Sequence, residues 1–276
     1  MNLKIDRPIY LFERQKMTYI MEAKTIQANA FKTLIEALKE ILNDANLEFD
    51  EYGIKIKAMD SSHTVLVYLK LEAGKFESYK CYNKIIIGVS MINFFKLIKT
   101  MCGNDTLTLF IEEDNPNVLG IKLENGEKNS VTTYRLNLMD LNEEDLNLPP
   151  ASFDSVITMP SVDFQKYCRD MHQFAEIVEI KSIGSLLYLS CKGDFASQES
   201  IIGEADCGIS FVQNTNPNEI VQGLFALKHL VMFTKCTNLC QQIEILLKND
   251  FPLIIKYQVA SLGEIKLALA PQCNVD

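Results

Sequence analysis

The hydrophobic positions of this chain follow a helical period in four separate segments. In one of them, Phe164, Cys168 and Met171 form part of a single apolar stripe, and Ser161 stands where an N-cap residue is expected. The four segments recur at intervals of roughly 60 to 70 residues, at 29–44, 90–102, 161–174 and 225–236. This spacing predicts four amphipathic helices.

The segments between these predicted helices alternate apolar and polar residues or are rich in β-branched residues. They include GIKIKAMDSSHTVLVYLKL, TLTLFIEE, VLGIKLE, LLYLSC, IEILLK and FPLIIKYQVA, with Gly, Asn and Asp at the turns. A period of two predicts antiparallel strands. Because the order of helix, strands, helix and strands occurs twice, we expect an α+β fold of two similar halves, each with two helices backing an antiparallel sheet.

The boundary between the halves is expected near 138–156, where an acidic cluster precedes Pro149 and Pro150. Leu141, Leu146 and Phe153 make this segment too apolar for an idle spacer, so we expect it to pack on the protein. We assign 1–20 as an N-terminal extension, 21–137 as the first domain, 138–154 as a connector, 155–271 as the second domain and 272–276 as a tail.

Composition narrows the class of protein. The chain has 47% hydrophobic and 23% charged residues, as globular proteins do, and no apolar run reaches the roughly 18 residues of a membrane span. Its eight cysteines form no C-x-x-C pair, and with only three histidines a zinc site at Cys236 and Cys240 is disfavoured. We expect reduced thiols in a cytosolic or nuclear setting, with no metal and no cofactor.

Each predicted helix carries two basic residues, although the net charge of the chain is −9. Lysines often face solvent on surface helices without any function. Their recurrence on all four helices of an acidic protein nevertheless favours one basic surface that contacts a duplex backbone without reading bases. The first helix is the weakest case because Glu36 and Glu40 lie nearby. The candidate DNA-facing residues are Lys32, Lys39, Lys96, Lys99, Lys166, Arg169, Lys228 and Lys235.

The segment MDSSH (59–63) contains the side-chain types of a serine hydrolase within five positions. Neighbouring residues of an extended segment point to opposite faces, however, and a catalytic relay is assembled from distant parts of a chain. The chain has no G-x-S-x-G, no G-x-x-x-x-G-K-[ST] and no G-x-G-x-x-G. An enzyme that uses Ser62 and His63 is therefore the least favoured alternative.

From Met21 to Pro271 the chain resembles the proliferating cell nuclear antigen (PCNA) family, the eukaryotic and archaeal sliding clamps of DNA replication. Several collinear segments carry the resemblance: IEALKEILNDA (35–45), AMDSSHTVLV (58–67), IGVSM (87–91), LMDL (138–141), MPSVDF with YCRDM (159–171), FALKHLVMFTK (225–235), PLIIKY (252–257) and LALAP (267–271). The resemblance implies two clamp-type domains per subunit and a homotrimeric ring around duplex DNA, with helices inside and sheets outside. It also implies that an edge strand around Val131 to Leu138 pairs with the edge around Phe195 to Gly203 of the next subunit.

The resemblance gives MDSSH a place in a front-face pocket for short partner motifs of the type Q-x-x-Ψ-x-x-aromatic-aromatic. The implied pocket residues are Met59, Ser61, His63, Leu66, Leu146, Leu148, Pro149, Phe153, Pro252, Leu269, Ala270 and Pro271. Ala268 departs from the large aromatic that the family usually has before L-A-P, and Thr64 replaces a common aliphatic residue. The position of the family's ubiquitin-accepting lysine falls near Gly184.

The partners implied are double-stranded DNA, a DNA polymerase, a clamp loader and motif-bearing proteins such as flap endonuclease and DNA ligase, with no membrane. The alternatives within this fold are a subunit of a heteromeric ring and a monomeric processivity factor. We expect a nuclear location in a eukaryotic host, and otherwise the cytoplasm or a viral replication site.

Overall fold

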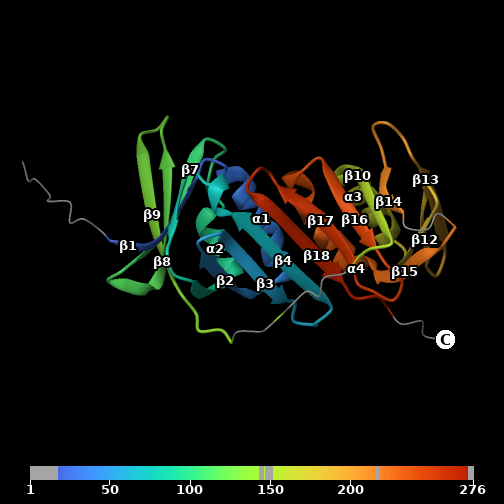
Figure 1. Ribbon diagram of the computed structural model, residues 1–276, viewed down its shortest axis with the longest axis horizontal. Coiled ribbons are helices and arrows are strands. Elements are labelled where there is room, and N and C mark those ends of the chain that lie inside the picture. The colour runs from blue at the N-terminus through green and yellow to red at the C-terminus, as the bar shows by residue number, and fades with distance from the viewer. Residues whose placement is uncertain (1–17, 143–145, 147–151, 215–217, 273–276) are drawn as a thin grey trace, which may run out of the picture.

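The computed structural model describes residues 18–142, 146, 152–214 and 218–272 (Figure 1). The first half contains β1 (Tyr19–Thr25), α1 (Ala28–Ile41), β2 (Asp44–Asp50), β3 (Gly53–Met59), β4 (Val65–Glu72), a 3₁₀ turn (Ala73–Lys75), β5 (Ser78–Cys81), β6 (Ile85–Ser90), α2 (Met91–Ile98), β7 (Asp105–Glu112), β8 (Asn115–Asn125) and β9 (Ser130–Asn137). The second half contains β10 (Ser155–Pro160), α3 (Ser161–His172), β11 (Ile177–Ile183), β12 (Leu186–Lys192), β13 (Ser197–Gly203), β14 (Ser210–Asn214), β15 (Val221–Ala226), α4 (Leu227–Phe233), a 3₁₀ segment η2 (Thr234–Leu239), β16 (Gln242–Leu247), β17 (Leu253–Val259) and β18 (Gly263–Leu269).

The strand pairings of the two halves are the same. In the first half β1 lies between β5 and β7, and β8 lies between β7 and β9. The strands β4, β3, β2 and β6 are neighbours in that order. In the second half β10 lies between β14 and β16, and β17 lies between β16 and β18. The strands β13, β12, β11 and β15 are neighbours in that order. The predicted α+β fold of two similar halves is confirmed, and the structure adds the strand-by-strand equivalence.

One central sheet runs through both halves. Its order is β14-β10-β16-β17-β18-β4-β3-β2-β6, and antiparallel pairing of β18 with β4 is the junction between the halves. A five-stranded sheet ends in β9 and a four-stranded sheet ends in β13, and these sheets lie at opposite ends of the elongated molecule (Figure 1). Both β9 and β13 are therefore free edges.

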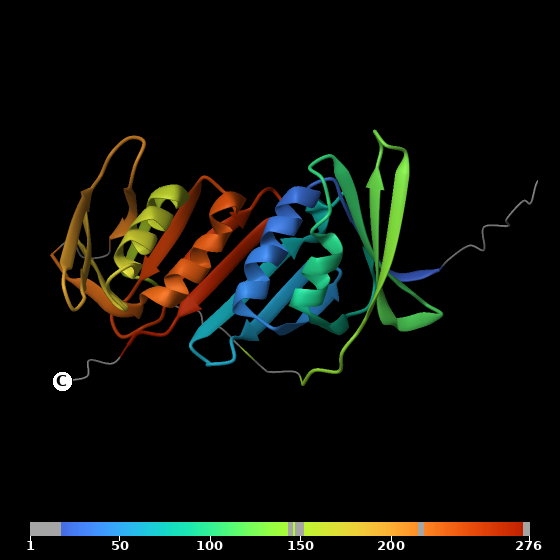
Figure 2. The same cartoon turned by 180° about the vertical axis from the view of Figure 1, so that it is seen from behind.

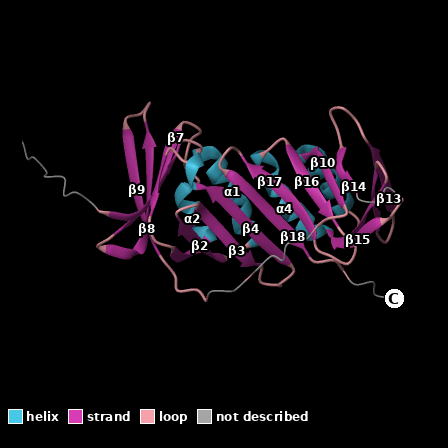
Figure 3. Ribbon diagram, viewed as in Figure 1, coloured by secondary structure: helices cyan, strands magenta, loops and turns pink. Residues whose placement is uncertain are grey.

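The four helices form a row on one face of the central sheet, in the order α3, α4, α1, α2 (Figure 2). The view from the other side shows strands in front and helices behind (Figure 3). Each helix buries one apolar stripe, which in α1 includes Phe31, Leu34 and Leu38. The predicted N-cap at Ser161 is wrong: Ser161 is the first residue of α3, and its buried hydroxyl donates to the carbonyl of Cys240 at 2.7 Å.

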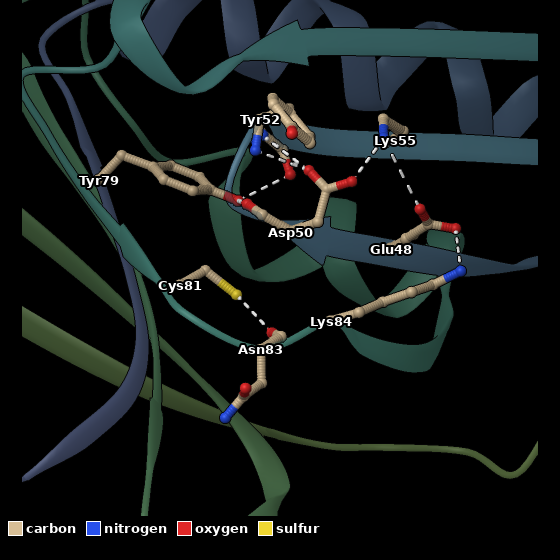
Figure 4. Close-up of polar contacts among 9 residues, drawn as sticks. Glu48, Asp50, Tyr52, Lys55, Tyr79, Cys81, Asn83 and Lys84 are labelled. Carbon is tan, nitrogen blue, oxygen red and sulfur yellow. Dashed lines mark hydrogen bonds and ion pairs between the residues drawn. The ribbon is translucent and has the colours of Figure 1, made fainter.

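A polar network holds the β2–β3 hairpin against β5 (Figure 4). The hydroxyl of Tyr79 lies 2.7 Å from the carbonyl oxygen of Gly53 and 2.9 Å from that of Asp50. Burial opposes ionisation of Asp50, but hydrogen bonds from Lys55 and from the backbone of Tyr52 hold its pKa below the ordinary value. The first turn of the central sheet is thus fixed by local polar contacts.

Candidate functional site

The MDSSH segment is the turn between β3 and β4, and its aspartate organises that turn. Asp60 is only 8% exposed, and its Oδ1 accepts hydrogen bonds from the backbone N–H groups of Thr64 and Val65 at 2.8 and 2.7 Å. Its Oδ2 accepts from the hydroxyl of Ser62. Burial alone would raise the pKa of Asp60, but these hydrogen bonds hold it below the ordinary value. The carboxylate is therefore occupied by its own loop.

His63 lies at the exposed tip of this turn. Its backbone has a φ of 52°, and its own N–H donates to the carbonyl oxygen of Asp60 at 2.9 Å. The Asp60 carboxylate bonds to Ser62 and to the backbone, so it does not orient the imidazole as a triad acid would. The MDSSH segment therefore lacks the geometry of a catalytic triad, and His63 is a surface residue.

An apolar row crosses four strands beside this turn, on the sheet face away from the helices. Met59 lies opposite Leu66, Leu66 opposite Ala268, and Ala268 opposite Ile254. Met59 and Leu66 are half-buried, and Ala268 contributes only a methyl group at the middle of the row. This apolar row, called the slot, thus has a small side chain between its larger members.

The connector begins at one border of this slot. The N–H of Met139 donates to the carbonyl oxygen of Gly88 at 2.8 Å, which extends the central sheet by one bridge beyond β6. A side chain at Gly88 would meet the Met139 carbonyl oxygen at 2.4 Å, so the close approach requires glycine. A groove of about 240 Å³ separates Leu141 of the connector from Met59 of β3. The connector therefore packs on the protein, as its apolar residues predicted.

The other end of the connector and the C-terminal segment border the slot as well. The ring of Phe153 meets that of Phe251 edge-on, with centroids 5.7 Å apart. After β18, the N–H of Ala270 donates to the carbonyl oxygen of Thr64 at 3.0 Å, which ties this segment to the MDSSH turn. Among the other pocket candidates, Leu146, Pro252 and Pro271 are half-buried, whereas Ser61 is exposed in the turn.

The structure places one pocket candidate in the core. The side chain of Leu269 is fully buried, opposite Leu253 and Val65, so it supports the slot from beneath. Because side chains alternate between the two faces of a strand, Ala268 and not Leu269 faces outward, and the LALAP sequence alone could have predicted this. Leu148 and Pro149 lie outside the described residues.

Six of the eight candidate basic residues are exposed on the helical face. They are Lys96, Lys99, Lys166, Arg169, Lys228 and Lys235, and none of the six forms an ion pair within the described part of the chain. The helices α2 and α3 have the same order of buried and exposed positions, so their basic residues occupy matching places. Lys96 donates a hydrogen bond of 3.4 Å to Oδ1 of Asn93 on the same helix. The exposed positive charges of this face are available to an anionic partner.

The two lysines of α1 are engaged within the chain. Lys32 donates to the carbonyl oxygen of Met101 at 3.0 Å, and Lys39 forms an ion pair with the adjacent Glu40. Glu36 is exposed on the same helix. The free positive charge of the helical row therefore comes from α2, α3, α4 and η2. The glutamates beside the lysines of α1 already indicated in the sequence that this helix would contribute least.

The described thiols show no sign of metal chemistry. The seven cysteines within the described ranges are free, and no three His, Cys, Asp or Glu side chains gather there in a possible metal site. Burial raises the pKa of Cys168 and Cys236, so these thiols stay protonated at neutral pH. No helix in these ranges has the length and apolar character needed to cross a membrane.

A duplicated α+β unit with paired helices on one face and a continuous sheet on the other defines the class of DNA clamp folds. Comparison with known families agrees. Residues 20–146 match the family described as "Proliferating cell nuclear antigen, N-terminal domain", and residues 147–272 match the family described as "Proliferating cell nuclear antigen, C-terminal domain". The chain belongs to the PCNA family.

Curated relatives support the same conclusion. The chain is 36% identical over 256 residues to the "Probable DNA polymerase sliding clamp 1" of Paramecium bursaria Chlorella virus 1, covering 91% of this chain and 97% of the viral protein. It is 32% identical over 268 residues to the "Proliferating cell nuclear antigen" of Chaetomium thermophilum, covering 93% of this chain and all of the fungal protein. The similarity thus extends over nearly the whole length of each protein.

Proposed function

We propose that this chain is a DNA sliding clamp, a processivity factor that encircles duplex DNA and tethers a DNA polymerase. The observation that carries the proposal is the separation of two surfaces in a chain that matches both PCNA domains. Six exposed basic side chains lie on the helical face, and an apolar slot lies on the opposite face of the same sheet. A tether acts by raising the effective concentration of the polymerase at the primer end, which needs no catalytic group.

On the helical face, the proposed ligand is the phosphate backbone of double-stranded DNA. Lys166, Arg169, Lys228 and Lys235 are exposed cations without ion-pair partners in the described ranges. Contacts of this kind are salt-sensitive and independent of sequence, so they allow a ring to slide.

On the opposite face, the proposed ligands are short clamp-binding motifs with aromatic anchors. Met59 and Leu66 of the slot, with Phe153 and Pro271 on the neighbouring segments, offer apolar side chains to such anchors. We propose that proteins such as flap endonuclease, DNA ligase and the polymerase bind here, and that a clamp loader engages the ring.

The free edges β9 and β13 support assembly of the chain with further copies of itself. A head-to-tail contact between different surfaces makes a ring when its rotation closes, and a homotrimer is the ring we propose. A heteromeric ring and a monomeric factor are the competing states. We retain 21–137 and 155–271 as the proposed domains, 138–154 as the connector, and the nucleus or a viral replication site as the location.

The decisive test of encirclement compares linear duplex DNA with open ends and the same DNA with both ends blocked by bound streptavidin. A preassembled ring threads onto the open molecule, so crosslinking should trap several-fold more protein on open DNA than on blocked DNA. Equal retention on both would mean surface binding and would contradict encirclement.

A further inference from the structure

A second row of side chains runs beside the slot on the same face of the central sheet. Residues two apart on a strand point to the same face, and two residues along from the slot on β3, β4, β18 and β17 stand Lys57, Tyr68, Lys266 and Lys256. Lys57 lies opposite Tyr68, Tyr68 opposite Lys266, and Lys266 opposite Lys256. These four residues, called the lysine row, therefore run parallel to the slot at a distance of about 7 Å.

The lysine row borders the slot on one side, and the MDSSH turn borders it on the other. The four strands lie side by side on the face toward the viewer in Figure 1. Lys57 also lines the groove of about 240 Å³ that separates Met59 from Leu141 of the connector. A ligand seated in the slot would therefore have cationic side chains along one flank.

The lysines of this sheet face are placed against their own mutual repulsion. Lys266 lies directly opposite Lys256, and in the next row Lys55 lies directly opposite Lys70. Like charges at directly opposite positions destabilise an antiparallel pair of strands. A sheet face shaped by stability alone would alternate its charges, so this arrangement favours an anion from outside the chain.

The carboxylates of the chain neutralise the lysine row only in part. Lys256 forms ion pairs with Glu244 at 3.2 Å and with Glu264 at 3.3 Å, and Lys266 shares Glu264 at 3.0 Å. Lys57 is exposed and has no ion pair within the described ranges. The row is therefore positively charged, although the net charge of the chain is −9.

We propose that the lysine row is a second part of the partner site and takes acidic residues that flank the aromatic anchors of a partner motif. The inference rests on the proposed function and adds a rule for the choice of partner. Charge complementarity and continuity with the slot support this occupant. Lysine stems are apolar and their ends are charged, so they can pack beside an aromatic anchor and still reach a carboxylate. Contacts between exposed charges select among partners more than they raise affinity.

Single-stranded DNA is the competing occupant, because lysines beside an aromatic ring can also hold a nucleotide strand. Tyr68 is the aromatic member of the row. It is half-buried, and the Nζ of Lys266 lies over its ring, 5.8 Å from the centroid. A ring covered in this way offers little surface for a stacked base, so the row fits carboxylates better.

Calorimetry with synthetic peptides tests the inference. One core, Q-x-x-Ψ-x-x-Phe-Phe, is made with three glutamates before it, with three glutamates after it, or with serines at both ends. Because exposed charge pairs contribute little each, we expect one glutamate peptide to bind about fivefold more tightly than the serine peptide at low salt. The preference should fall below about twofold at high salt, where such pairs are screened.

A double variant removes charge from the row without shortening its side chains. Lys57→Gln combined with Lys266→Gln should bind all three peptides within about twofold of one another, at the affinity that the unmutated chain has for the serine peptide. The matched control is Lys75→Gln combined with Lys80→Gln, at exposed positions outside the row, and it should keep the full preference.

A charge exchange separates recognition from a purely structural role. Lys57→Glu changes an exposed side chain that has no ion pair in the described ranges, so the fold should tolerate it. This variant should lose the preference for the glutamate peptide and gain one for the same core flanked by three lysines. A structural role of Lys57 would not produce that exchange.

The outcomes distinguish this inference from the proposed function. If the serine peptide binds and neither glutamate peptide binds more tightly, the lysine row has no part in the site and the slot stands. If no peptide binds the unmutated chain, the peptide site itself is wrong, and the inference falls with it. If oligothymidylate binds the unmutated chain but not the Lys57 and Lys266 double variant, and the peptides bind equally, the row belongs to nucleic acid and the inference is overturned.

Discussion

Replacing Asp60 by alanine removes the acceptor that closes the β3–β4 turn. Its carboxylate receives two short backbone hydrogen bonds, from Thr64 and Val65, as well as the Ser62 hydroxyl. Hydrogen bonds to a charged group contribute about 1.5–3 kcal/mol each, and a buried N–H left unpaired costs about 1–3 kcal/mol. Because the turn can relax and admit water, we expect Asp60→Ala to lower the free energy of unfolding by about 2–4 kcal/mol.

The pH dependence of this effect has a defined sign. The pKa of Asp60 is lower in the folded chain than its ordinary value near 4, so its stabilising contribution is present above that ordinary value. The contribution is lost as the pH falls through the lowered folded pKa. The difference in stability between the unmutated chain and Asp60→Asn, which keeps the shape but not the charge, should be constant above about pH 5 and should shrink below about pH 4.

Urea unfolding at fixed protein concentration measures both effects, because assembly makes apparent stability concentration-dependent. Asp114→Ala, at an exposed residue of the β7–β8 turn, is the matched control and should change the free energy of unfolding by less than about 0.5 kcal/mol. An Asp60→Ala variant as stable as this control would refute the assigned role of the carboxylate.

Three further predictions concern the two proposed binding surfaces. Arg169→Glu combined with Lys235→Glu should weaken retention on DNA at least tenfold and flatten its salt dependence, measured by crosslinking on open linear duplex, while peptide affinity stays the same; collapse of peptide binding would mean that the faces are wrongly assigned. Phe153→Ala combined with Leu146→Ala should weaken binding of an aromatic-anchored peptide about tenfold or more in calorimetry without changing the native mass; an equal loss of assembly would make the connector purely structural. His63→Ala should reduce peptide affinity by less than about tenfold, and loss of a chemical turnover by this variant would revive the enzyme alternative.

Much of the fold could be predicted from local pattern. The apolar stripe of Phe164, Cys168 and Met171 gave α3 to within two residues at its end, because a surface helix must bury one face. The duplication followed from the recurrence of such stripes. Neither signal reports which strands meet across the halves, so the β18·β4 junction and its register needed the structure.

The candidate site was harder to predict because side-chain direction depends on contacts between distant segments. Lys32 has the helical spacing of a solvent-facing cation. Its ammonium group nevertheless donates a hydrogen bond to the carbonyl oxygen of Met101, which is distant in the sequence. Leu269 belongs to a motif that borders the slot, yet strand alternation turns its side chain into the core. Asp60 showed a detectable signal, since Asp followed by two serines between two alternating runs is typical of a side-chain-closed turn.

We propose that copies of this chain close into a ring, and the native mass in solution tests this closure. Multi-angle light scattering across a range of protein and salt concentrations should give a mass near three times the 31.3 kDa of one chain. A mass that stays at 31.3 kDa under all these conditions would contradict self-closure and, with it, encirclement of DNA by this chain alone.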